Sequence, residues 1–188
     1  SLLGAETIVV HPIVCPPQVD QKAYNMEFFR SLLPLCRRFH ICVALENMWG
    51  TDKRRGCIIP NVCSFGRDLA EYVDELGDEH FTACLDVGHS AIVGEEPSDA
   101  IRALGSRLGT VHIHDNNYRE DSHMLPFTGN LDWKAIAKAL KEVHYQGPLN
   151  LEVLDFTERF PEDFLREACR FTFQVARYLA DLCEKIEC

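Results

Sequence analysis

The chain has 188 residues, of which 46% are hydrophobic and 26% are charged, a balance typical of an ordinary globular protein. Its formal net charge of −10 at pH 7 disfavours a broad electrostatic surface for nucleic acid, and no apolar run is long enough to span a bilayer. No signal peptide is visible, so we expect a cytoplasmic protein without membrane partners.

Nine cysteines occur in the chain, an odd number, and no two of them form a CxxC pair of the kind that binds zinc. Cys42 and Cys84 lie inside apolar runs that are predicted to be buried strands. We therefore expect reduced structural thiols rather than disulfides.

Apolar runs with strand character alternate with segments of helical periodicity along the chain. In chain order, the expected strands are Thr7–His11, Ile41–Glu46, Thr82–Asp86, Thr110–His112 and Leu149–Glu152. The expected helices are Gln21–Arg38, Asp68–Leu76, one that begins near Ser98, Asp132–Leu140 and Pro161–Ile186. This alternation predicts βαβ units and a parallel sheet. Residues 50–64 are expected to form a long loop, either simply solvated or acting as an active-site lid.

Four of the expected strands end on an acidic residue or a histidine: Glu46, Asp86, His112 and Glu152. An unpaired charge is costly out of water, so a buried strand has no reason to finish in this way. If the strands are parallel neighbours, these side chains converge, and three carboxylates beside one imidazole repel each other. A divalent cation removes that conflict, and we therefore predict a metal at this edge of the sheet.

Because these polar residues all lie at the carboxyl ends of their strands, the predicted fold is a (β/α)8 TIM barrel, in which such ends surround one centre. An open, doubly wound α/β sheet, which spreads the strand ends along a line, is the alternative. A complete barrel needs about 250 residues. We therefore interpret residues 1–188 as a single domain that holds the C-terminal five βα units of an incomplete barrel, with three N-terminal units absent. Its open edges would be Thr7–His11 and Leu149–Leu154, which favours pairing with a second chain as a homo-oligomer or with the absent units.

Short motifs along the chain resemble those of the xylose-isomerase-like TIM-barrel superfamily. They are Leu45-Glu46-Asn47, Asp86-Val-Gly-His89, Val111-His112-Ile-His-Asp115 and Leu151-Glu152. The segment His123–Trp133 is similar to the family's His…Pro-Gly-x-Gly-x-x-Asp-Trp turn, but Phe127 stands where the first glycine is usual, so we expect the loop backbone to differ there. The superfamily includes sugar and sugar phosphate isomerases, epimerases similar to tagatose 3-epimerase, inosose dehydratases and the endonuclease IV enzymes.

The resemblance to the epimerase branch implies that Glu46, Asp86, His112 and Glu152 hold one divalent metal. Mostly oxygen ligands suit Mn²⁺, Mg²⁺ or Co²⁺, and the imidazole leaves Zn²⁺ open; Mn²⁺ is the expected cofactor. The implied activity is that of a metal-dependent isomerase or epimerase of a sugar or sugar phosphate, with proton transfer through a metal-stabilised enediolate. Glu46 and Glu152 would be the catalytic residues, on opposite faces of a small sugar-like substrate.

Three further residues are candidates for substrate binding: His11, His89 and Arg119. His89 would bind a substrate oxygen, or instead support a metal ligand or begin a helix. Arg119 would neutralise a phosphate or fix a hydroxyl group, or instead be an exposed loop arginine. For His114 and Asp115, a structural hydrogen bond and a catalytic role both stay open.

Two alternative functions also stay open. Asp121 and His123 resemble the Asp-x-His metal ligands of endonuclease IV, and together with His11, His89 and the four predicted metal ligands they could build a multi-zinc site that cleaves DNA. The net charge of −10 and the lack of basic loops interleaved with aromatic residues count against this alternative. The third interpretation is an inactive or truncated barrel, whose lost activity would come from absent strands rather than from altered metal ligands.

Overall fold

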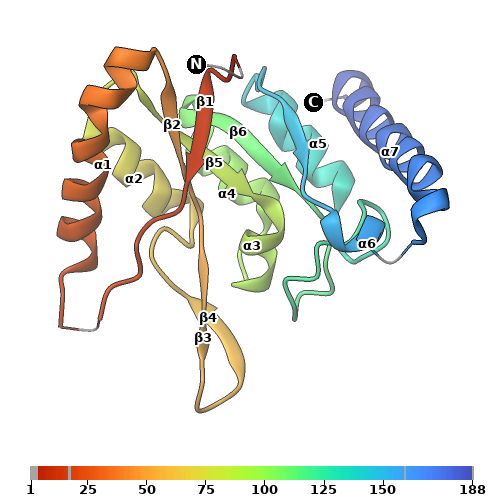
Figure 1. Ribbon diagram of the computed structural model, residues 1–188, viewed down its shortest axis with the longest axis horizontal. Helices are drawn as coiled ribbons and strands as arrows, with labels where there is room; N and C mark the ends of the chain where they lie inside the picture. Colours follow the sequence, from red (N-terminus) through yellow and green to blue (C-terminus); the bar gives the residue numbers. More distant parts are fainter. Residues whose placement is uncertain (1–3, 17, 159, 188) are drawn as a thin grey trace.

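The computed structural model describes residues 4–16, 18–158 and 160–187. Its main feature is a five-stranded sheet with the strand order β1-β2-β5-β6-β7 (Figure 1). The strands are β1 (Thr7–Val10), β2 (Cys42–Glu46), β5 (Phe81–Asp86), β6 (Leu108–Ile113) and β7 (Leu149–Leu151). Every neighbouring pair runs parallel, which confirms the expected part of a (β/α)8 barrel and excludes the reversed strand order of a doubly wound sheet.

Five longer helices pack around the sheet and lie to its left, behind it and to its right in Figure 1. They are α1 (Gln21–Phe39), α2 (Gly66–Leu76), α4 (Pro97–Leu104), α5 (Trp133–Glu142) and α7 (Leu165–Lys185). Side-chain caps fix two of the starts: Asp20 accepts a hydrogen bond from the backbone N–H of Ala23 before α1, and Asp132 caps α5 in the same way. Helices α1 and α5 therefore begin where the sequence offers an acidic cap, whereas α2, α4 and α7 begin without a side-chain cap.

Short helical segments accompany the longer helices. They are α3 (Val87–Ile92), α6 (Leu154–Glu158) and the 3₁₀ turns Gly105–Arg107 and Glu162–Phe164. The expected helix over residues 161–186 is wrong in its first turn, because a 3₁₀ turn precedes α7 there. Helix α3 has too few residues for a visible apolar period, and it begins because Asp86 accepts a hydrogen bond from the backbone N–H of His89.

The expectation of an irregular loop over residues 50–64 is wrong. The segment forms an antiparallel hairpin of β3 (Trp49–Asp52) and β4 (Cys57–Pro60), which projects away from the parallel sheet (Figure 1). Its turn is built by Asp52, whose side chain accepts hydrogen bonds from the backbone N–H groups of Arg54 and Arg55. Gly56 follows with a φ of 64°, a conformation that glycine adopts without steric cost.

The two faces of the sheet carry different side chains because successive residues of a strand point in opposite directions. One set is apolar and packs with the helices in the hydrophobic core: Val43, Leu45, Ala83, Leu85, Val111 and Ile113. The alternate positions, which lie on the other face, are Ala44, Glu46, Cys84, Asp86, Thr110 and His112. The polar residues thus point away from the helices, as the interior of a barrel requires.

Strands β1 and β7 are the two ends of the sheet, as the sequence predicted. Each presents backbone groups on one side without a neighbouring strand among the described residues. None of the described helices has the length and apolar character needed to cross a membrane. Cytoplasmic localisation and the absence of three N-terminal units stay predictions.

The open edges predict concentration-dependent association of the 188-residue chain. Replacing Ile8 of β1, which is 42% exposed, by lysine should weaken this association, because charged edge strands resist pairing. Sedimentation velocity at several protein concentrations measures the effect. Ile59→Lys on the hairpin, at 38% exposure, is the matched control and should leave association unchanged. A wild-type chain that sediments as a monomer throughout would contradict the prediction.

Candidate metal centre

Four side chains from four strands meet at the carboxyl edge of the sheet. Glu46 and Asp86 are the last residues of β2 and β5, His112 is the penultimate residue of β6, and Glu152 directly follows β7. Each offers a ligand atom, and these atoms all lie within 4.8 Å of one another. The structure therefore brings together the four residues that the sequence singled out as metal ligands.

His112 stands at the middle of this group and faces all three carboxylates. Its Nδ1 lies 3.0 Å from Oε1 of Glu46, 3.0 Å from Oε2 of Glu152 and 4.0 Å from Oδ2 of Asp86. Burial opposes the charged form of His112, but Glu46 and the other carboxylates outweigh it and raise its pKa. A single ring proton cannot satisfy two carboxylates at hydrogen-bonding distance, so the group as it stands carries excess negative charge.

Two buried carboxylate oxygens in this group lack a hydrogen-bond partner among the described residues: Oε2 of Glu46 and Oδ2 of Asp86. Nε2 of His11 lies 2.9 Å from Oε2 of Glu46, but the two atoms are not aligned for a hydrogen bond. Buried carboxylates without partners are costly, and a bound cation removes the cost. Three carboxylates and one imidazole form a donor set that a divalent first-row metal or Mg²⁺ fits.

A second group of possible ligands lies next to the first and consists of His89, His114, Asp121 and His123, again with ligand atoms within 4.8 Å of one another. Asp121 is its centre: Oδ2 lies 3.3 Å from Nε2 of His89 and 3.4 Å from Nε2 of His123, and Oδ1 lies 3.6 Å from Nε2 of His114. The sequence left the role of His114 open. Its position two residues after His112 nevertheless predicts that both side chains lie on the same face of the sheet.

Electrostatics in the second group favour charged side chains. Burial opposes ionisation of Asp121, but hydrogen bonds from His123 and His89 outweigh it and lower the pKa of Asp121. Burial also opposes the charge on His89, whose pKa is nevertheless raised to about 10 by Asp86 and Asp121. A hydrogen bond to Asp121 raises the pKa of His123 to about 9.

The remaining predicted binding residues lie in different surroundings. Both ring nitrogens of His89 are engaged, because Nδ1 lies 2.9 Å from the backbone oxygen of Asn47 and Nε2 faces Asp121. This arrangement favours a supporting role over direct substrate contact. His11 lies beside Glu46 at the solvent-exposed mouth of the site, which is the side where the ligand group opens to water, and 62% of its side chain is exposed. Arg119 is exposed, and within the described chain its side chain makes no ion pair or hydrogen bond with the metal-centre residues.

Sequence reasoning missed residues that hold the strand ends in place. Asn47 is fully buried, donates through Nδ2 to the backbone oxygen of Asp86 and accepts through Oδ1 from the backbone N–H of Asp86. Trp49 donates through Nε1 to Oδ2 of Asp121 at 3.1 Å. Both contacts join residues far apart in the chain, so no local pattern could have revealed them.

Asp115 organises the loop that carries Asp121 and His123. It is fully buried and accepts four hydrogen bonds, from the backbone N–H groups of Asn116, Phe127 and Leu131 and from Nε1 of Trp133. Its backbone also pairs with Met124 in both directions. The structure therefore gives Asp115 the structural hydrogen bonds that were one of its two interpretations.

Phe127, which replaces the glycine usual at this position, has a φ of 73°. This left-handed conformation is one that favours glycine, and the phenylalanine adopts it here. Its ring packs on Trp133 and Tyr178, with centroids 5.7 Å and 5.4 Å away. The aromatic contacts join the loop to α7 and offset the backbone strain.

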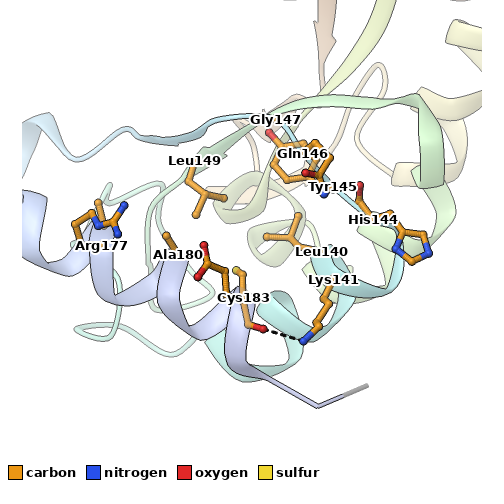
Figure 2. A pocket seen from close by; sticks show the side chains of 12 residues that line it. Leu140, Lys141, His144, Tyr145, Gln146, Gly147, Leu149, Arg177, Ala180 and Cys183 are labelled. Atoms are coloured by element: carbon orange, nitrogen blue, oxygen red, sulfur yellow. Dashed lines mark hydrogen bonds between the residues drawn. The ribbon is translucent and has the colours of Figure 1, made fainter.

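A cavity of about 570 Å³ lies at the opposite end of the sheet, near the beginning of β7 (Figure 2). Its lining comes from α5, the connection to β7, and α7, and includes Leu140, Leu149, Ala180 and Cys183. None of the residues of either ligand group lines it. The two groups of titratable residues therefore lie at the carboxyl edge of the sheet, away from this cavity.

The chain belongs to the xylose isomerase-like TIM barrel family, whose model matches residues 1–175. It is 28% identical over 151 residues to a D-psicose 3-epimerase of Enterocloster bolteae, covering 80% of this chain and 47% of that protein. It is 44% identical over 159 residues to an uncharacterized protein of Sinorhizobium fredii, covering 81% of this chain and 48% of that protein. The chain therefore spans about half the length of these curated relatives.

Solved structures show the same fold. A xylose isomerase domain protein from Alicyclobacillus acidocaldarius superimposes with a TM-score of 0.74 at 22% identity, over 97% of this chain and 66% of that one. For a D-tagatose 3-epimerase-like protein the TM-score is 0.73 at 20% identity, over 95% and 65%. For the IOLI protein, whose structure contains a zinc atom, it is 0.71 at 18% identity, over 97% and 64%. These likenesses confirm the barrel.

Removal of the Asp115 carboxylate should destabilise the protein strongly. Asp115→Ala leaves four donors without their acceptor, and we expect the free energy of unfolding to fall by about 3 kcal/mol. Asp132→Ala removes an exposed cap at the end of the same loop and should cost about 1 kcal/mol. Urea denaturation measures both. Equal losses in the two variants would show that the buried network has no special role.

Mn²⁺ should stabilise the protein through Glu152. At a concentration 100 times the dissociation constant, one bound ion stabilises by about 2.7 kcal/mol. Glu152→Gln should unfold at nearly the wild-type temperature in EDTA, because the side chain is 39% exposed, but should lose most of the rise caused by Mn²⁺. Thermal unfolding with and without Mn²⁺ measures this. The exposed Glu158→Gln is the control, and an equal Mn²⁺ response in the two variants would exclude Glu152 as a ligand.

Proposed function

We propose that the chain carries the active site of a divalent-metal-dependent isomerase or epimerase that acts on a small sugar or sugar phosphate. The observation that supports this most is the pair Glu46 and Glu152, whose carboxylates approach the same nitrogen of His112 from strands on its two sides. The relationship to a D-psicose 3-epimerase supports the same class of reaction.

In this proposal Glu46, Asp86, His112 and Glu152 hold the metal. When bound, a divalent cation would polarise the substrate carbonyl and reduce the cost of negative charge on its oxygen. Mn²⁺ is the proposed ion because three of the four ligands are carboxylates. Zn²⁺ stays an alternative, supported by the imidazole and by the zinc atom in the IOLI structure.

The two glutamates would move the proton. One carboxylate removes the proton from the carbon beside the carbonyl, which leaves an enediolate, and the other returns a proton to the opposite face. Their environments differ: the side chain of Glu46 is 2% exposed, whereas that of Glu152 is 39% exposed at the mouth. Return to the opposite face inverts the carbon, and return to the neighbouring carbon isomerises the sugar.

His11 and Arg119 are the proposed contacts for substrate oxygens. His11 is mostly exposed and already lies beside Glu46, so it can reach a substrate that binds at the mouth. Arg119 extends from the loop that follows β6 and carries a positive charge toward solvent. His89 would act indirectly, by holding Asp86 and Asp121 in place.

Solvent exchange tests the proposal. Protein loaded with Mn²⁺ is incubated with a panel of ketoses, aldoses and their phosphates in deuterated water, and deuterium beside the carbonyl is measured by mass spectrometry. Both the 188-residue chain and any longer polypeptide that contains it are assayed. Glu46→Gln and Glu152→Gln should lose exchange by about 100-fold or more, because each removes a proton-transfer group. Glu120→Gln, exposed on the loop after β6, should keep it.

The multi-metal alternative gives a different result. The group His89, His114, Asp121 and His123 could hold further ions and would support cleavage of phosphodiesters. Cleavage of DNA at abasic sites, without deuterium exchange in any sugar, would overturn the proposed function in favour of this alternative. Absence of both activities would favour the inactive barrel.

A further inference from the structure

A cysteine lies next to the candidate metal centre, on the same face of the sheet. Cys84 is two residues before Asp86 on β5, so both side chains lie on the face of the sheet that points away from the helices. In the sheet register Cys84 is the direct neighbour of Glu46 on β2 and of Thr110 on β6. It is fully buried.

The thiol belongs to a ligand group of its own. The ligand atoms of Cys84, Glu46 and His112 all lie within 4.8 Å of one another. Glu46 and His112 are also members of the oxygen-rich group with Asp86 and Glu152. Moreover, Oε2 of Glu46 is buried without a hydrogen-bond partner among the described residues, although Nε2 of His11 lies 2.9 Å from it.

The two overlapping groups differ in chemistry. Carboxylates suit hard ions such as Mg²⁺ and Mn²⁺, whereas a thiolate selects softer ions such as Zn²⁺. We propose that Cys84 is a ligand for thiophilic divalent ions. These ions bind between Glu46, His112 and Cys84, closer to the amino-terminal end of β5 than Asp86 is. The inference rests on the metal centre of the proposed function, but not on the sugar as its substrate.

Binding of a thiophilic ion forms a sulfur–metal bond and releases the thiol proton to solvent. The ion would take Glu46 and His112 as ligands, which the oxygen-rich position also uses. Thiophilic ions should therefore compete with Mn²⁺. They should also draw Glu46 away from the carboxylate pair that moves the proton.

Cadmium provides the test, because a cadmium–thiolate bond has an ultraviolet charge-transfer band that oxygen ligands do not produce. The exposed Cys57 and Cys169, together with Cys188, are first replaced by serine to reduce background. Titration with Cd²⁺ should give a band that saturates at one ion per chain and disappears in Cys84→Ser. The affinity for Cd²⁺ should fall about 10-fold or more in that variant, while the affinity for Mn²⁺ changes by less than about twofold.

Cys36→Ser is the matched control, because Cys36 is also buried but lies on α1, in the helix layer. It should keep the band. Cys84→Ala is measured as a second variant, and circular dichroism shows whether each variant folds. A folded Cys84→Ser protein that keeps the full band would overturn the role of Cys84 and leave the metal centre intact. If the wild-type protein binds neither Cd²⁺ nor Mn²⁺, the proposed metal centre is wrong as well.

Discussion

Three carboxylates face one imidazole nitrogen at the carboxyl edge of a parallel sheet, and this unbalanced charge is the constraint on which the rest of the structure depends. Burial makes unpaired negative charge costly, so positive charge has to be supplied at this edge of the sheet. Part of this positive charge comes from the histidines around Asp86. Burial opposes the charge on Asp86, but His89 and His114 outweigh this effect and lower the pKa of Asp86. Glu46 and Asp86 still have unpartnered oxygens, which is why a cation fits this chemistry better than further protonation does.

Asp86 also explains why the two ligand groups are neighbours. Its Oδ1 lies 2.9 Å from Nε2 of His114 and accepts a hydrogen bond from the backbone N–H of His89, while its Oδ2 faces His112. The same carboxylate thus belongs to the oxygen-rich group and touches the histidine-rich one. A rigid support is needed for such an arrangement, and Asn47 and Asp115 provide it by fixing the backbone of Asp86 and of the loop after β6.

The strand order and the four converging residues were predictable because both follow from local patterns. Burying an unpaired charge is costly, so an apolar strand that ends on Glu46 or Asp86 is unexpected unless the charge has a partner. This pattern therefore indicates a ligand-binding site without any knowledge of the fold. The hairpin was missed because its strands are short and lack clear alternation, and its turn depends on the side chain of Asp52. Asn47 and Trp49 were missed as supports because their partners lie 39 and 72 residues away. Such contacts are made by the tertiary fold and leave no sequence period.

Metal binding and substrate choice depend on different parts of the barrel. The four proposed ligands lie on β2, β5 and β6 and directly after β7, which are consecutive strands in the sheet, so the described strands suffice to bring the ligands together. Substrate contacts in a barrel come from loops around the whole ring, and the relatives are longer than this chain. In the proposed function, binding of a metal would therefore depend on the sheet described here, whereas the choice of substrate would also depend on whatever borders the open sides of β1 and β7. For this reason a metal-binding measurement tests the centre more directly than any survey of substrates.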